Sequence, residues 1–290
     1  MPDLAPVLTF ARLTMWEASR RKLLLAVLVL TVLVVGATGW GFSEIAHTNG
    51  PGGEPLGEVQ VRLIASQTLI LVTFLFAAVL ALMSVLVAAP SISGDVESNI
   101  VLALLARPVR RSELVLGKWL GLAALVVMYT AGSAILELAV VDIATGYVPP
   151  RPVELMVYVA AIGLVLTTLA LMLSTRLAGM TAAIIPLICY FVGWVGGILG
   201  GIGQAIGNNG LIAAGVVSRL LLPTDGLWRA AVYAMEPASV VAGLRAAGPL
   251  NAANPFAVSD GPAVPFLLWT ALWFLVMVGL TLWSFRRREI

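Results

Sequence analysis

The chain has 290 residues, of which 60% are hydrophobic and 11% are charged, whereas an ordinary soluble domain is about 45–50% apolar and about 25% charged. So few ionic side chains cannot cover a soluble protein, and the mean hydropathy of +1.01 indicates a surface that faces lipid. This composition excludes an ordinary soluble enzyme and fits one transmembrane domain over residues 1–290. A single Cys and a single His also exclude an intramolecular disulfide and a Cys/His metal centre.

The segment before the first apolar stretch, residues 4–22, alternates apolar and charged side chains. This pattern predicts an N-terminal amphipathic helix on the inner membrane surface, and the alternative is a polar extension of the first span. The basic residues Arg20, Arg21 and Lys22 precede an apolar stretch that is longer than the hydrophobic region of a signal peptide. We therefore expect residues 23–42 to remain in the protein as the first span.

Six gaps between successive charged residues predict six membrane spans, because a spanning helix needs about 20 mostly apolar residues. The gaps begin at Lys22, Arg62, Lys118, Glu154, Arg176 and Asp260 and hold 21, 32, 18, 21, 42 and 25 uncharged residues. The predicted spans are residues 23–42, 63–89, 114–141, 154–175, 180–203 and 263–285. The 12 residues 211–222, which follow a polar Gly-rich stretch, are too short to cross. We expect a re-entrant or interfacial segment there, or half of a broken helix.

The Lys and Arg residues predict that both termini are cytoplasmic. With the N-terminus inside, the inner side carries 12 of the 17 basic residues and six acidic ones, and the outer side carries five basic and nine acidic residues. This distribution follows the positive-inside rule. The net charge of +2 therefore reflects membrane topology and gives no support for nucleic-acid binding. The predicted fold class is an all-α integral membrane protein.

The cytoplasmic loop between the second and third spans, residues 89–121, holds most of the charge on the inner side. Pro90 is expected to end the second span, and Asp95 and Glu97 to lie near the N-terminus of a short amphipathic helix that ends near Ala106. Ser112 is expected to cap the third span.

This loop has two interpretations from its residues alone. It is either a juxtamembrane segment lying on lipid headgroups or a helix that docks into a cytoplasmic partner. In the second case the apolar stripe fills a groove and the arginines pair with acidic residues around it. The stripe and the arginines are Ile100, Val101, Leu104, Leu105, Arg107, Arg110 and Arg111.

The loop also resembles a known family. A small-residue turn, an acid-x-acid pair and the stretch LALLARPVRRSELVLGK are similar to the cytoplasmic signature of type-2 ABC exporter permeases. The most similar branch is that of the nitrous oxide reductase maturation permease, also known as multi-copper enzyme maturation permeases. Asn99 departs from the Gly or Thr common in that branch. A second stretch, LLPTDGLWRAAVYAMEP, resembles a segment that follows the fifth span there. The matching loop positions are Glu97, Arg107, Pro108, Val109, Arg111, Gly117 and Lys118.

The resemblance implies a permease of the prokaryotic plasma membrane that works as a homodimer or pseudo-dimer with two copies of a separate ABC ATPase. ATP and Mg²⁺ would be bound by that partner, and this chain would hold no cofactor. Gly117 and Lys118 do not form a phosphate loop, because Trp119 stands where Ser or Thr is needed. The short cytoplasmic helix would be the coupling helix. Its ATPase contact would comprise Asp95, Glu97, Ile100, Leu104, Arg107, Pro108, Arg110 and Arg111.

Three glycines at a spacing of four, Gly193, Gly197 and Gly201, allow the fifth span to approach another helix closely. The resemblance suggests a dimer seam here, and packing within the chain is the alternative. Two acidic residues, Glu137 and Asp225, are candidates for the transport pathway. For Glu137 a position at the headgroup level is favoured, and for Asp225 a role at a helix start.

These patterns together predict the permease subunit of an ABC exporter that moves a hydrophobic or amphipathic solute outward, and not an enzyme. The alternative is a non-transporting membrane scaffold, or a subunit that passes force from the ATPase to an outer partner. An intramembrane enzyme is least supported, since the chain offers no paired acid and base and no metal ligand set.

Overall fold

The computed structural model describes residues 4–20, 22–48, 54, 56–98 and 110–288, and these form helices without strands. Among these described residues, six helices are long and apolar enough to cross a membrane. They are α2 (Lys22–His47), α3 (Glu58–Ala88), α6 (Arg111–Thr145), α7 (Pro152–Ser174), α8 (Gly179–Ile206) and α12 (Val264–Arg286). Each predicted span falls on one of these helices and extends beyond it by at most one residue, so the all-α, six-span prediction is confirmed.

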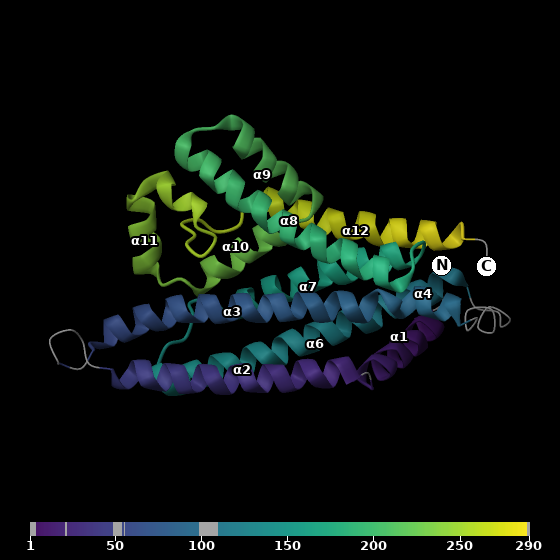
Figure 1. Ribbon diagram of the computed structural model, residues 1–290, viewed down its shortest axis with the longest axis horizontal. Coiled ribbons are helices and arrows are strands. Elements are labelled where there is room, and N and C mark those ends of the chain that lie inside the picture. Colours follow the sequence, from purple (N-terminus) through teal and green to yellow (C-terminus); the bar gives the residue numbers. More distant parts are fainter. Residues whose placement is uncertain (1–3, 21, 49–53, 55, 99–109, 289–290) are drawn as a thin grey trace.

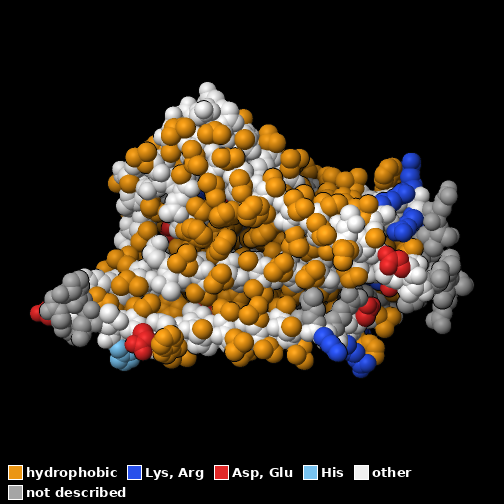
Figure 2. Space-filling model, in the orientation of Figure 1, with side chains coloured by type: hydrophobic (Ala, Val, Ile, Leu, Met, Phe, Trp, Pro, Cys, Tyr) orange, Lys and Arg blue, Asp and Glu red, His pale blue; other side chains and the backbone are white. Residues whose placement is uncertain are grey.

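The spanning helices lie side by side along the long axis of the molecule (Figure 1). We call the end where α6 begins and α12 ends the loop end, and the end where α7 begins and α8 ends the opposite end. On the face in Figure 2, hydrophobic side chains cover the middle and charged ones gather toward the ends. Among the spans, α3 and α7 are the most buried and α2 is the most exposed. The bundle therefore packs around α3 and α7 and presents an apolar belt.

The N-terminal helix α1 (Leu4–Ser19) is separate from α2 and packs against the beginning of α6. Leu8, Leu13 and Trp16 are exposed on it. The structure thus has an independent helix rather than a polar extension of the first span.

Pro90 does not stop the helical chain as predicted. Ala89 keeps helical backbone angles (φ −56°, ψ −46°), and α3 together with α4 (Pro90–Glu97) forms one candidate span of 40 residues. Proline removes one backbone donor. The hydroxyls of Ser91 and Ser93 donate to the carbonyls of Ala88 and Ala89, which supports the chain around the proline. Asp95 and Glu97 consequently lie in the last turn of α4 and not near a helix N-terminus.

A broken helix pair stands between α8 and α12, where a re-entrant or interfacial segment was predicted. Helices α9 (Asn209–Leu221) and α10 (Thr224–Met235) meet at an angle of 95°. Leu222, at the bend, lies beside Gly193 in the middle of α8. At the far end of α10, the carbonyl of Ala234 accepts from the backbone N–H of Arg151, just before α7. The pair therefore enters and leaves at the opposite end, as a re-entrant segment does. The short helices α11 (Ala238–Ala246) and η1 (Gly248–Ala253) follow it.

Candidate functional site at the loop end

A buried ion pair joins α4 to α6 at the loop end. The Nζ of Lys118 lies 2.5 Å from Oδ2 of Asp95, and the two side chains are 7% and 16% exposed. The same ammonium group donates to the carbonyl of Ser91. Because a charge removed from water is costly unless it is paired, this contact fixes the end of α4 against α6. Asp95, predicted to face an ATPase, is directed toward Lys118.

The glycine before Lys118 lets α1 cross α6 at close range. A Cβ atom on Gly117 would lie 2.4 Å from Cβ of Phe10 and 2.7 Å from the carbonyl oxygen of Val7. One turn later, a Cβ on Gly121 would lie 2.5 Å from the carbonyl oxygen of Ala11. The Gly-Lys pair of the cytoplasmic signature thus has two structural roles. The glycine allows α1 to pack closely against α6, and the lysine binds α4.

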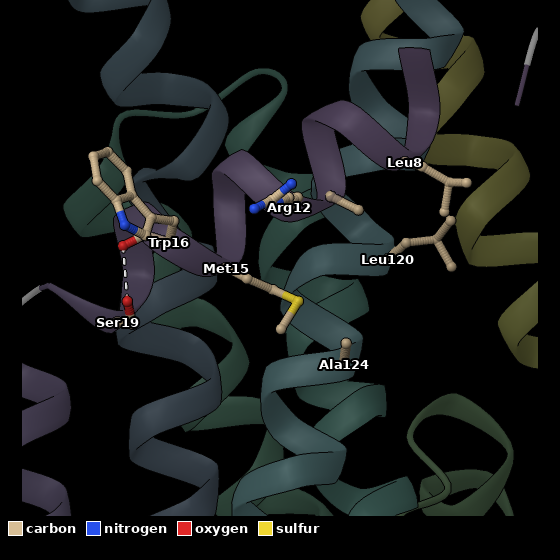
Figure 3. Close-up of a pocket in the computed structure, with 8 residues that line it drawn as sticks. Leu8, Arg12, Met15, Trp16, Ser19, Leu120 and Ala124 are labelled. Atoms are coloured by element: carbon tan, nitrogen blue, oxygen red, sulfur yellow. Dashed lines mark hydrogen bonds between the residues drawn. The ribbon is translucent and has the colours of Figure 1, made fainter. Parts of the chain in front are cut away.

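An apolar groove of about 610 Å³ runs between α1 and α6. Figure 3 shows Leu8 and Met15 of α1 beside Leu120 and Ala124 of α6, with Arg12 as the basic residue of the lining. A groove of this composition can receive apolar side chains or lipid chains.

At the loop end, arginine side chains connect the ends of neighbouring helices by donating hydrogen bonds to backbone carbonyls. Arg111 donates from Nη1 to the carbonyl of Arg288 (2.6 Å) and to that of Arg286 (3.3 Å). Arg288 donates to the carbonyl of Thr175 (2.6 Å), and Arg176 donates to Ser284. Cations at helix C-termini are favourable because the last carbonyls lack partners within the helix. Within this chain Arg111 binds the end of α12, and its contact with an ATPase stays a prediction.

The remaining predicted contact residues lie around the loop itself. Glu97 is exposed at the end of α4, and Arg110 is exposed just before α6. The backbone N–H of Arg110 donates to the Glu113 carboxylate at 3.0 Å. Glu113 therefore supports the start of α6, and the N-cap position is held by Arg110 and not by Ser112, which was predicted as the cap. The predicted coupling helix beyond residue 98, with Ile100, Leu104, Arg107 and Pro108, lies outside the described residues.

The predicted dimer-seam glycines of α8 face helices of the same chain. A Cβ on Gly197 would lie 2.1 Å from the Asp225 carboxylate, and one on Gly201 would lie 2.0 Å from the carbonyl oxygen of Ala252. Gly193 is close to Thr224 and Leu222. The intrachain alternative is therefore what the structure has, and we do not assign this face to a dimer seam.

Asp225, a candidate pathway residue, lies at the bend of the re-entrant pair in a buried ion cluster. Its Oδ2 accepts from Nε of Arg219 at 2.7 Å and lies 3.4 Å from Nε of Arg229. Arg229 also donates to the carbonyls of Gly197 and Ala252. The carboxylate is fully buried and makes no cap hydrogen bond. Asp225 lies in the first turn of α10, where a helix start was predicted, but its carboxylate links α8, α9 and α10 and does not cap the helix.

Glu137, the other candidate, is 3% exposed within the bundle. Neither of its carboxylate oxygens has a hydrogen-bond partner in the described part of the chain. It lines a small cavity of about 30 Å³ together with Thr73, Thr130 and Ser133. The carboxylate is therefore enclosed by α3, α6 and α7, and its predicted position at the headgroup level stays a prediction.

Another buried carboxylate, Glu236, follows α10 at the opposite end. It is 2% exposed, and its Oε1 accepts from the backbone N–H of Val258 at 3.2 Å. Burial raises the pKa of Glu236 to about 7, and the Val258 hydrogen bond opposes that rise only in part. Burial also raises the pKa of the neighbouring Tyr147, whose hydroxyl donates to the carbonyl of Met235.

Sequence reasoning missed several of these contacts. The pairing of Asp225 with Arg229 had a signal in the sequence, since the two are four residues apart in one helix. The pairing of Asp95 with Lys118 had none, because their helices are joined by a loop and the pairing depends on how these helices pack.

The comparisons with known proteins agree with this architecture. The family described as ABC-2 family transporter protein matches residues 11–290. A search of curated proteins finds no match. The family match covers all six spanning helices, the re-entrant pair and most of α1. The chain therefore belongs to the ABC-2 family of transporter proteins, as a multi-pass membrane subunit that works with an ABC ATPase.

Proposed function

We propose that this chain is the permease subunit of an ABC exporter in a prokaryotic plasma membrane, of the branch that includes the nitrous oxide reductase maturation permease. Two copies of the chain would work with two copies of a separate ATPase, which binds ATP and Mg²⁺. Hydrolysis would move a hydrophobic or amphipathic solute from the loop end to the opposite end. We call the segment between α4 and α6, residues 98–110, the docking loop. The observation that carries this proposal is the Asp95–Lys118 ion pair, because it connects the two spanning helices on either side of that loop.

The contacts around α4 supply a route for force from a docked ATPase. The helix continues α3 through Ala89, so a push on the loop moves a candidate span of 40 residues. Lys118 passes the same movement to α6. A Cβ on Gly179, at the start of α8, would lie 3.1 Å from the Ser93 hydroxyl, so α8 is in contact as well. Packed helices that respond together shift as rigid bodies.

The docking test uses the full-length chain, purified with an affinity tag from its native membranes. The wild type is expected to bring down a protein that hydrolyses ATP. Arg107→Glu combined with Arg110→Glu should abolish this recovery, because the change reverses two charges beside the loop. Arg62→Glu at the opposite end, where Arg62 is paired with Glu58, is the control. Unchanged recovery of the ATPase by the double variant would overturn the docking assignment.

The transport test separates an exporter from a scaffold. The purified complex is reconstituted in proteoliposomes with amphipathic fluorescent solutes, and movement is followed with ATP, without ATP and with a vanadate-inhibited ATPase. An exporter moves at least one solute only during hydrolysis. A complex that hydrolyses ATP while moving none of them would instead support a force-transmitting scaffold.

A further inference from the structure

Two cavities at the opposite end share a wall made by the re-entrant pair. The first is about 500 Å³ and the second about 410 Å³, within the size range of sites for small organic ligands. Arg219 and Arg229 line both cavities, and so do Val258 and Asp260. The two spaces therefore meet at the guanidinium groups that flank Asp225.

The first cavity is polar and basic. Arg245 adds a third guanidinium to its wall, and Gln204, Asn251 and Ser259 add neutral polar groups. Three arginines stand against two carboxylates, those of Asp225 and Asp260, which leaves one net positive charge. In the described part of the chain, Nε of Arg219 has a partner but its two terminal nitrogens have none. These donors suit a carboxylate or phosphate group.

The second cavity is apolar apart from the shared residues. Its wall includes Val216 and Leu220 of α9 and Phe266 and Trp269 of α12. The indole N–H of Trp269 donates to the carbonyl of Leu220, so α9 is held against α12 beside the cavity. A basic polar space and an apolar space that meet at two arginines match a molecule with an acidic head and an apolar chain.

We propose that the two cavities form one binding site for an anionic amphiphile, with its acidic head between Arg219 and Arg245 and its apolar chain along Val216 and Phe266. This inference rests on the proposed function and names the chemical class of the solute that the transporter moves. The ion cluster around Asp225 links the site to α8, so occupancy and helix movement act on the same contacts.

Binding is tested without the ATPase. The full-length protein in neutral detergent is mixed with equal amounts of dioleoyl phosphatidylglycerol and dioleoyl phosphatidylcholine, and bound lipid is counted by native mass spectrometry. The wild type should favour the anionic lipid by at least about tenfold, as one charge-assisted hydrogen bond allows. Arg245→Gln should reduce this preference, and so should Arg219→Lys, which keeps the charge beside Asp225 but loses the planar fork. Arg62→Gln is the control.

The position of the lipid's apolar chain is tested with two matched substitutions in α9. Val216→Trp fills the apolar cavity, whereas Val217→Trp adds the same side chain at a neighbouring residue that lines neither cavity. Both valines are about half exposed (49% and 53%), so neither change crowds the core. Only Val216→Trp should weaken phosphatidylglycerol binding. Equal binding of the two lipids by the wild type, or equal loss in the two variants, would overturn the site.

Transport of the lipid across the membrane is tested with the ATPase present. Proteoliposomes should move fluorescent phosphatidylglycerol during hydrolysis, and Arg245→Gln should slow this movement. Selective binding without movement, while another solute is exported, would overturn the substrate class and leave the exporter assignment intact. Selective binding by a chain that recovers no ATPase would contradict the proposed function and leave the binding site intact.

Discussion

Lys118 of α6 and Asp95 of α4 form a buried ion pair at the point where the chain leaves the bundle for its docking loop. A pair in this position makes α4 and α6 respond together to whatever the loop binds. Its loss should therefore affect both folding and coupling.

Lys118→Met is expected to destabilise the protein by about 3 kcal/mol, because it leaves the Asp95 carboxylate buried without its partner. Asp95→Leu in the same chain should recover most of that loss, since it removes the unpaired charge. The stability of both variants is measured by thermal unfolding in detergent. The repaired double variant should still bind the ATPase but should lose the stimulation of hydrolysis by solute. Full stimulation in that variant would show that the pair is not part of the coupling route.

Gly117→Ala is expected to displace α1, because its Cβ would lie 2.4 Å from Phe10. The matched control is Gly132→Ala in the same helix, where no atom lies within 4 Å of the new methyl group. Replacing Gly by Ala inside a helix otherwise stabilises by about 1 kcal/mol. Opposite changes in melting temperature are therefore expected, with faster proteolysis of α1 in Gly117→Ala alone. The same response in both variants would mean that α1 does not cross α6 at Gly117.

Glu236 should make the protein less stable as the pH rises from about 4.5 to about 7. Its pKa is higher in the folded chain than in the unfolded one, so over this window the folded state binds more protons and ionisation destabilises it. Glu236→Gln removes the ionisation and keeps the acceptor for Val258. The variant should melt higher than the wild type at pH 8 and at nearly the same temperature at pH 4. Glu44→Gln, at an exposed position, controls for net charge. An unchanged difference between the two pH values in Glu236→Gln would contradict this assignment.

Asp225→Asn should destabilise the re-entrant pair, because two partly buried guanidinium groups lose their common, fully buried counter-charge. Gly197→Ala should have a similar effect, since its Cβ would overlap the same carboxylate. Gly279→Ala in α12, with nothing within 4 Å, is the control. The fraction of folded protein that remains after heating is measured for all three variants by size-exclusion chromatography. A loss in Asp225→Asn without one in Gly197→Ala would place α8 farther from the cluster.

The six spans could be predicted from the sequence because charge is excluded from lipid and the gaps between charged residues show it directly. The helix ends could not, because α3 begins at Glu58 and keeps Arg62 within it, and α6 reaches Thr145. The gaps between charged residues mark the hydrocarbon layer, and a helix can continue beyond it. Part of the docking loop was recognised by family resemblance, and its central residues are outside the structural description.

Buried contacts between distant segments were the part that sequence reasoning could not supply. The spacing of Gly193, Gly197 and Gly201 correctly predicted that another segment packs closely against α8. It did not indicate which segment that is. Glu137 was expected at the headgroup level because an acid within the hydrocarbon of the membrane is costly. Local sequence carries no information on which helices enclose it, since that depends on the packing of α3, α6 and α7.

The re-entrant pair has a practical consequence for anyone handling this protein. Because α9 and α10 enter and leave at the same end, they add no crossing, and the described N-terminal and C-terminal residues lie together at the loop end (Figure 1). A tag or fluorescent protein fused to either terminus therefore stands at the loop end, and one at the C-terminus follows Arg288, whose carbonyl accepts from Arg111. The connection between His47 and Glu58, at the opposite end, is the better place for a reporter.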